Sequence, residues 1–193
     1  MTALHLRAAS RAAGRHLVRF ARDEGGNATI EFVLFVPFFL MLFLSTFEMG
    51  MLMVRQTMLD RGLDITVRLI RLGEMRNASD ELVVNRANIV RSICFFSGGL
   101  IPDCSNRLRV EMVRLDPHDW NPMAAAPDCV NVDEPNEPSG PFQTGAPNDL
   151  MFIRACALFD PYAPTAGLGA GLHRQTGDLY AMFSTSAYVV EPN

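Results

Sequence analysis

FVLFVPFFLMLFLSTF, residues 32–47, contains no charged side chain. Extended to Val54, the apolar stretch is interrupted by a single charge, Glu48. As a helix rising about 1.5 Å per residue, residues 32–54 would measure roughly 34 Å, and the hydrocarbon core of a membrane is about 30 Å thick. The alternative is a buried helix of a soluble protein, but such helices are rarely apolar on every side over this length. We therefore expect a membrane-spanning helix, in which Pro37 is tolerated.

The apolar stretch differs from a secretory signal peptide, which has a shorter core followed by a small-x-small cleavage site. Here it ends in Glu48-Met49-Gly50-Met51, so we expect the helix to be retained. Beyond Val54, apolar residues recur at three- and four-residue spacing at Met58, Leu59, Leu63, Val67 and Ile70. This spacing predicts one helix over residues 27–73, half membrane span and half amphipathic stalk, whose apolar stripe is covered by the domain that follows.

The charges on the two sides of the span differ in sign. Residues 1–26 carry five Arg and two acidic residues, a net charge of +3, whereas the remainder carries 12 Arg and 19 acidic residues. Because basic flanks stay on the cytoplasmic side, we expect residues 1–26 to form a cytoplasmic leader and residues 74–193 a periplasmic domain. The leader's Arg7, Arg11, Arg15 and Arg19 indicate a basic amphipathic helix on anionic lipid. Nucleic-acid binding is disfavoured because the span follows within a few residues.

A short motif stands directly before the span, Gly25-Gly26-Asn27-Ala28-Thr29-Ile30-Glu31-Phe32. Counted from Asn27, Glu31 is the fifth residue. Gly26 is small and flexible enough to enter a peptidase in extended form, and a cut after it would leave a cationic amine on Asn27. The Glu31 carboxylate, costly at the lipid edge without a partner, can neutralise such an amine on a neighbouring subunit. The alternative is that the glycines merely loosen the chain and that Glu31 is a solvated interfacial charge.

This N-terminal region resembles the TadE-like minor pseudopilins of the tight-adherence (Flp) pilus machinery of bacteria. The features shared with the family are the Gly-rich start, Glu31 followed by the aromatic Phe32, Pro37 within the span and a second acid, Glu48. The C-terminal residues 187–192 also resemble the family's final strand, which ends in Glu-Pro. The motif-rich resemblance covers roughly residues 22–60.

The resemblance implies cleavage between Gly26 and Asn27 by a prepilin peptidase and a role in pilus assembly or initiation. The implied partners are the inner membrane, other pilin or pseudopilin subunits, the peptidase and the pilus assembly platform. Glu31, Phe32 and Glu48 would then be assembly or recognition residues. For Glu48, two interpretations stay open: an interfacial acid that reaches water, or a buried contact to a basic group on a partner pseudopilin.

The four cysteines, Cys94, Cys104, Cys129 and Cys156, all follow the span, as suits an oxidising compartment. Three pairings are possible. We favour Cys94 with Cys104, because that short loop spans Gly98-Gly99, and Cys129 with Cys156, which would tie an acidic, Pro-rich loop over residues 116–149 to a following strand.

The outer domain is predicted to be a small α+β unit. Ser79-Asp80-Glu81 is a favourable helix start, with a helix over residues 82–93. Leu108, Val110 and Met112 alternate with charged residues and predict a strand, and residues 150–159 and 180–190 predict two more. Residues 161–177 read as a Gly-rich loop. The fold class is thus a long N-terminal transmembrane and stalk helix followed by a short helix and a few antiparallel strands.

An enzymatic function is disfavoured. Gly167-Leu168-Gly169-Ala170-Gly171-Leu172 fails the GxGxxG pattern at its last position, the four His are scattered, and no CxxC pair suggests zinc. We expect a structural assembly protein without metal or cofactor. The alternative is an uncleaved signal anchor that carries a periplasmic ligand-binding or enzymatic domain, and the N-terminus of the mature protein separates the two.

Overall fold

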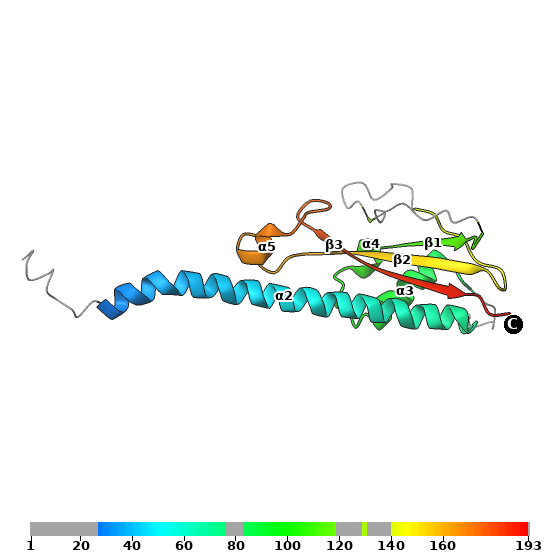
Figure 1. Ribbon diagram of the computed structural model, residues 1–193, viewed down its shortest axis with the longest axis horizontal. Coiled ribbons are helices and arrows are strands. Elements are labelled where there is room, and N and C mark those ends of the chain that lie inside the picture. The colour runs from blue at the N-terminus through cyan, green and yellow to red at the C-terminus, as the bar shows by residue number, and fades with distance from the viewer. Residues whose placement is uncertain (1–26, 76–82, 119–128, 131–139, 193) are drawn as a thin grey trace, which may run out of the picture. The chain divides into compact units, whose positions relative to one another are not determined.

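In a computed structural model of the chain, residues 27–75, 83–118, 129–130 and 140–192 are described. The chain divides into two compact units, Met1–Phe43 and Leu44–Asn193. The helix α2, Asn27–Arg71, contributes residues to both (Figure 1). Its bounds confirm the single long helix expected from the apolar stretch and the periodic pattern after it.

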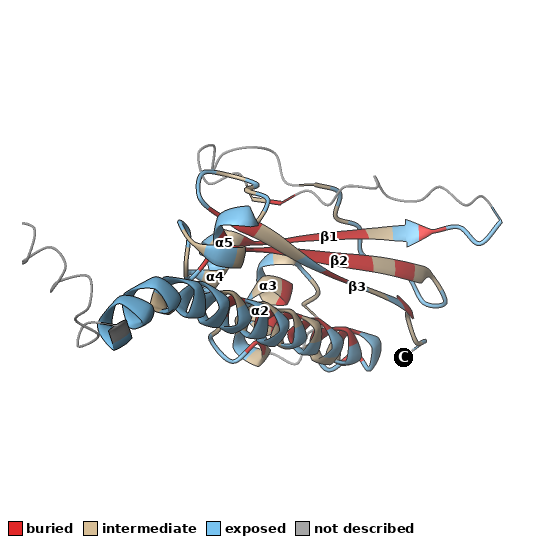
Figure 2. Ribbon diagram, turned by 60° about the vertical axis from the view of Figure 1, so that its left-hand side comes forward, coloured by how far each residue is buried: buried red, intermediate tan, exposed pale blue. Residues whose placement is uncertain are grey.

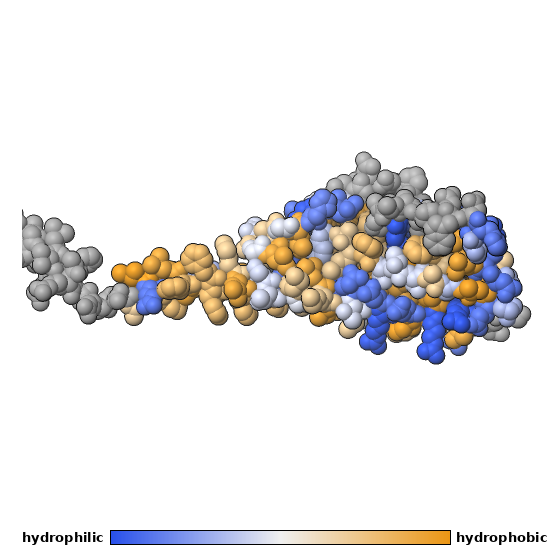
Figure 3. Space-filling view, viewed as in Figure 1, coloured by the Kyte–Doolittle hydropathy of each residue, from blue (hydrophilic) through white to orange (hydrophobic). Residues whose placement is uncertain are grey.

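In the first unit, the apolar side chains of α2 are exposed. They include Ile30, Phe32, Val33, Leu34, Phe35, Phe38, Phe39, Leu40, Met41, Leu42 and Phe43. Figure 3 shows this part of the helix mostly in orange and tan, with a blue patch near its start. Among the described residues, α2 alone is both long and apolar enough to cross a membrane.

In the second unit, the described residues form the rest of α2, three short helices and one antiparallel sheet. The helices are α3 (Arg86–Phe96), α4 (Cys104–Arg107) and α5 (Gly167–Gly171). The strands are β1 (Leu108–Leu115), β2 (Leu150–Phe159) and β3 (Tyr180–Val189), in the order β1-β2-β3. This arrangement confirms the α+β fold class, and β2 has the predicted bounds.

The strand register puts alternate residues on opposite faces of the sheet. Val110 lies opposite Ala155, and Ala155 lies opposite Ser184, so these three share one face. Residues of that face share the main core with α2 and α3, which supply Leu59, Leu63, Val67, Ile70, Ile89 and Ile93. Figure 2 shows buried residues in red on α2, on α3 and along the strands. The amphipathic half of α2 is therefore covered by the domain, as its spacing predicts.

A close approach of α2 and α3 depends on Gly62. A Cβ at this position would lie 2.6 Å from Oγ of Ser97 and 2.9 Å from the Ile93 carbonyl oxygen. One turn further along, the Thr66 hydroxyl donates a hydrogen bond to Gly62 O at 2.8 Å and contacts the Ser92 hydroxyl at 3.0 Å. The two helices thus meet through small and hydroxyl-bearing side chains, and α3 completes the core behind α2.

The second helix was predicted too early in the chain. Residues 83–85 are not helical, and α3 begins at Arg86 because the extended Asn85 caps it, its side chain accepting a hydrogen bond from Asn88 N at 2.8 Å. The proposed start at Ser79-Asp80-Glu81 lies outside the described residues. The helix ends at Phe96, before Gly98-Gly99 as expected.

Two further features depart from the sequence prediction. The segment interpreted as a loop over residues 161–177 contains α5, and a one-turn helix, α4, precedes β1. The charged residues that alternate with the apolar ones in β1 are not solvated, since Arg109 and Glu111 are buried. Glu111 is paired with Arg154 of β2, and a smaller apolar cluster of Cys129, Cys156, Leu158 and Leu179 lies on the same side. On this second face, β1 and β2 are therefore largely buried, whereas Phe183, Thr185 and Ala187 of β3 are exposed.

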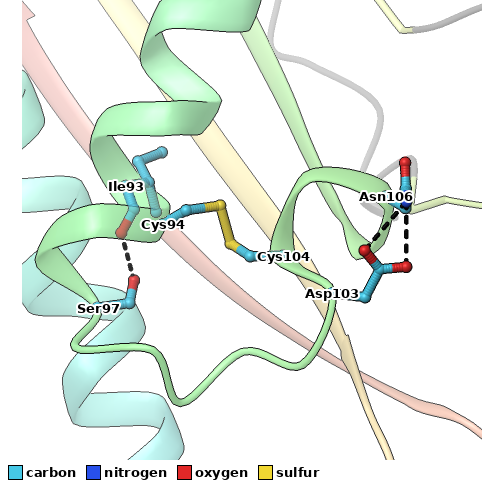
Figure 4. The surroundings of a disulfide bond; sticks show 6 residues. All are labelled: Ile93, Cys94, Ser97, Asp103, Cys104 and Asn106. Carbon is cyan, nitrogen blue, oxygen red and sulfur yellow. Dashed lines mark hydrogen bonds between the residues drawn. A yellow bond between two sulfur atoms is a disulfide. The ribbon is translucent and has the colours of Figure 1, made fainter.

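Two disulfides are formed, Cys94–Cys104 and Cys129–Cys156. These are the pairs that the loop lengths favour. Figure 4 shows the first, which joins the end of α3 to α4. Around it, the Ser97 hydroxyl donates to Ile93 O, and the Asn106 amide bonds both oxygens of Asp103, which holds a left-handed conformation with φ of 45°. The second disulfide ties residue 129 to β2.

Candidate functional site

The sequence-predicted site residues fall in separate places. Gly26 lies outside the described residues, and Asn27 is the first residue of the described helix. Glu31 and Phe32 follow on α2 with exposed side chains. Within the described part of the chain, the exposed Glu31 carboxylate forms no hydrogen bond or ion pair, so it is available to another molecule.

Glu48 is instead fully buried. One carboxylate oxygen accepts the backbone N–H of Tyr162 at 2.9 Å and that of Ala163 at 3.0 Å, and the other lies 3.2 Å from the same Tyr162 nitrogen. Charge-assisted bonds of this kind offset part of the cost of burying a carboxylate. The interpretation of Glu48 as an acid that reaches water is therefore wrong, because its side chain is enclosed by the connection between β2 and β3.

The same connection is held on α2 at a second point. Leu168 N donates to the Ser45 hydroxyl oxygen at 3.2 Å, at the start of α5. Gly169 makes the close approach possible, since a Cβ there would lie 2.4 Å from Ala163 O and 3.3 Å from Oε2 of Glu48. The Arg174 side chain stabilises the segment by donating hydrogen bonds to the carbonyl oxygens of Pro164 and Gly169. Figure 1 shows α5 beside α2.

Arg55, two turns after Glu48, is the second buried charge of this region. Its guanidinium lies 4.3 Å from the centre of the Tyr162 ring and 5.1 Å from that of Phe159. It donates hydrogen bonds to Asp160 O at 2.7 Å and to the Tyr180 hydroxyl. A guanidinium enclosed by aromatic rings gains cation–π attraction where water is excluded.

Two buried tyrosine hydroxyls have raised pKa values. Burial raises the pKa of Tyr180, and the adjacent Arg55, which favours the phenolate, opposes this shift. Burial raises the pKa of Tyr188 to about 12. Both hydroxyls thus stay neutral at physiological pH, so the Arg55 charge is stabilised by π faces and oxygen acceptors and not by a phenolate.

Sequence reasoning missed Arg55, Tyr162 and Ser45 as members of this cluster. One available signal was the seven-residue spacing of Glu48 and Arg55, which places both on one face of a helix. Because the rest of this helix face is apolar, the charges of Glu48 and Arg55 indicate that each has a polar partner inside the protein. The partners themselves lie more than a hundred residues away in the sequence, for example 114 residues from Glu48 to Tyr162.

A groove of about 830 Å³ lies between α3, α4 and β1. Its polar lining includes Arg86, Arg91, Asp103 and Arg109, and Arg86 also donates to Gly140 O and packs over the Phe142 ring. Among the described lining residues, no His accompanies Ser105, and no group of three potential metal ligands occurs in the described part of the chain.

Residues 26–68 match the family model of TadE-like proteins. The match begins at Gly26, includes Glu31 and Glu48, and extends into the part of α2 that supplies the domain core, so the resemblance read from the sequence is confirmed there. No curated protein and no solved structure matches the chain. The match indicates a pilin-like protein associated with a tight-adherence pilus, from a family of structural proteins, and the apolar helix suits a membrane anchor.

Proposed function

With a TadE-like segment over residues 26–68 as premise, we propose that the chain is a minor pseudopilin of the tight-adherence (Flp) pilus. In this role it is processed by a prepilin peptidase and takes part in assembly or initiation of the pilus. The observation that carries the proposal is the coincidence of the family match with an apolar helix that has Glu31 near its start. Its partners are other pilin or pseudopilin subunits and the assembly platform.

The proposed topology is single-pass in a bacterial inner membrane. Residues 1–26 stay in the cytoplasm, because five Arg outweigh two acids there, and the domain from residue 74 on is periplasmic. The two disulfides support the periplasmic assignment, since such bonds persist in oxidising compartments. We propose that the processed subunit is also incorporated into the pilus.

Processing is tested by the mass of the chain in cells. Co-expression with a prepilin peptidase should remove residues 1–26, and Gly26→Val should block the change, because a branched side chain obstructs the extended backbone that the peptidase must bind. Gly25→Val is the matched control, since it leaves the residue at the cut unchanged. An unaltered mass with active peptidase would sink the proposal and favour the uncleaved signal anchor with a ligand-binding or enzymatic domain.

The proposed role of Glu31 is assembly and not folding. Its exposed carboxylate sits near the start of α2, where it can neutralise the Asn27 amine of a neighbouring subunit. Glu31→Ala should insert normally and form both disulfides, yet reduce piliation and co-purification with other pilins. Normal filaments in this variant would contradict the role.

Glu48 contributes to assembly indirectly in this proposal. Its carboxylate is occupied by the Tyr162 and Ala163 amides, so it fixes the surface that the domain offers to partners. Glu48→Gln should therefore weaken assembly only together with measurable loosening of residues 160–171. Lost assembly with an unchanged domain would instead favour a direct contact to a basic group of a partner.

A further inference from the structure

The connection between β2 and β3 contains an uncharged segment, residues 161–172, that we name the apolar loop. Its twelve residues include neither acidic nor basic side chains, although Asp160 precedes it and His173 and Arg174 follow it. Several of its residues are exposed, among them Tyr162 and Ala170. An exposed uncharged segment on a domain that is otherwise rich in charge requires an explanation.

The apolar loop is fixed to one level of α2. Glu48 holds the amides of Tyr162 and Ala163, and Ser45 holds that of Leu168. The Tyr162 ring also makes an edge contact with the Phe47 ring, with centroids 5.5 Å apart. The segment therefore stays beside residues 45–48 of the helix.

This level is where the uncharged part of the apolar stretch ends. A membrane span needs about 20 residues. Residues 28–47 supply this length, and Glu31 is the single charged residue among them. The next charge is Glu48. Tyrosine is enriched at the boundary between hydrocarbon and water, because its ring is apolar and its hydroxyl is polar. Tyr162 is 49% exposed and Phe47 46% exposed, so the pair presents such a boundary surface.

We propose that the apolar loop, with Tyr162 as its main contact, lies in the headgroup layer of the periplasmic leaflet of the membrane that α2 crosses. This inference rests on the proposed membrane anchor. The lipid surface would then fix the tilt and rotation of the domain relative to the bilayer, since the loop touches lipid on one side of the helix only. Glu48 and Ser45 act as positioning residues for this contact.

Brominated-lipid quenching of tryptophan fluorescence tests the contact in the full chain. The single Trp is first removed by Trp120→Phe, and Tyr162→Trp then places the reporter in the loop. Val189→Trp is the matched control, because residue 189 has a similar exposure, 48%, and ends the strand that leads away from the loop. Ala170→Trp is a second reporter on the exposed side of the loop, in case position 162 does not tolerate the larger ring.

The protein is inserted in vesicles of phosphatidylethanolamine and phosphatidylglycerol that carry bromine high on the acyl chains. Quenching at residue 162 or 170 should exceed that at residue 189 by about two-fold or more. Equal quenching at all three positions, in protein that floats with the vesicles, would overturn the loop contact and leave the anchor intact. Failure to float with the vesicles would overturn both.

Discussion

The carboxylate of Glu48 accepts the backbone N–H of Ala163 at 3.0 Å across 115 residues of sequence. The charged Glu48, which follows the uncharged part of the apolar stretch, thus forms a hydrogen bond within its own chain. The contact joins the helix to the connection between β2 and β3, so we expect its loss to affect that connection first.

Glu48→Gln should loosen residues 160–165 without unfolding the domain. The substitution keeps the size of the side chain but removes the charge, and hydrogen bonds to a charged group contribute about 1.5–3 kcal/mol. Amide exchange at Tyr162 and Ala163 should accelerate roughly ten- to a hundred-fold. Since Pro161 and Pro164 have no N–H, a peptide over residues 160–165 reports mainly on these two amides. Glu74→Gln, at an exposed acid beyond α2, is the control and should leave them unchanged.

Gly62→Ala and Gly50→Ala should have opposite effects on stability. At residue 62 the new methyl group would meet the Ile93 carbonyl oxygen, part of a helix backbone, at 2.9 Å, so overpacking should lower the free energy of unfolding by about 1–3 kcal/mol. At residue 50 nothing lies within 4 Å, and alanine should add about 0.5–1 kcal/mol of helix propensity. Denaturant unfolding in detergent compares the two, and equal effects would contradict the close packing of α2 on α3.

Glu111→Gln should destabilise the domain far more than Glu191→Gln. Glu111 lies 2.6 Å from Arg154 with both side chains nearly excluded from water, whereas Glu191 pairs with Arg71 at 2.8 Å in an exposed position. Breaking the buried pair should cost about 3 kcal/mol or more, because the buried Arg154 charge loses its carboxylate partner Glu111. The exposed pair should contribute less than about 1 kcal/mol. Similar losses in both variants would show that water reaches Arg154.

Non-reducing peptide mapping should recover Cys94 with Cys104 and Cys129 with Cys156. The closed loops have sequence separations of 10 and 27 residues. The loss of chain entropy in the unfolded state predicts a stabilisation of about 2.7 kcal/mol for the first disulfide and about 3.5 kcal/mol for the second. Replacing both cysteines of the second pair with Ala should therefore be slightly more destabilising than replacing those of the first. Free thiols at all four positions in protein from the periplasmic side would contradict both the pairing and the proposed topology.

The domain should lose stability between about pH 10 and 12. The pKa of the Tyr188 hydroxyl is raised to about 12 by burial, so the folded state keeps a proton that the unfolded chain releases near pH 10. The contribution of Tyr188 to the free energy of unfolding is present below pH 10. It falls by at most about 1.4 kcal/mol per pH unit as the pH rises above 10. Tyr188→Phe should flatten this part of the curve, whereas Tyr162→Phe, at a half-exposed ring, should not.

The long helix and the strands were predictable because their signals are local. An uncharged stretch and a three- to four-residue repeat define α2, and alternating or continuous apolar residues define the strands. The fold class follows from the order of these elements. The disulfide pairs were favoured on loop length, which is also a local argument.

The polar interior was not predictable in the same way. Charges at Arg109 and Glu111 look like a solvated strand face, and only the pairing with Arg154, 43 residues after Glu111, shows that the face is buried. Likewise, nothing near Glu48 in the sequence indicates Tyr162 and Ala163. Asn85 was overlooked as a helix cap because Ser79-Asp80-Glu81 has an equally favourable composition.

The core of the domain is built partly on the helix that also carries the exposed apolar stretch. Because Leu59, Leu63, Val67 and Ile70 of α2 are interior residues, no linker separates the domain-bearing part of the helix from the sheet. A force applied along this part of α2 would be transmitted to the sheet through the packed side chains. It would also be transmitted through the hydrogen bonds of Glu48 to the connection between β2 and β3. Residues 59–70 of α2 and the sheet would therefore respond to such a pull together, because packed side chains join them.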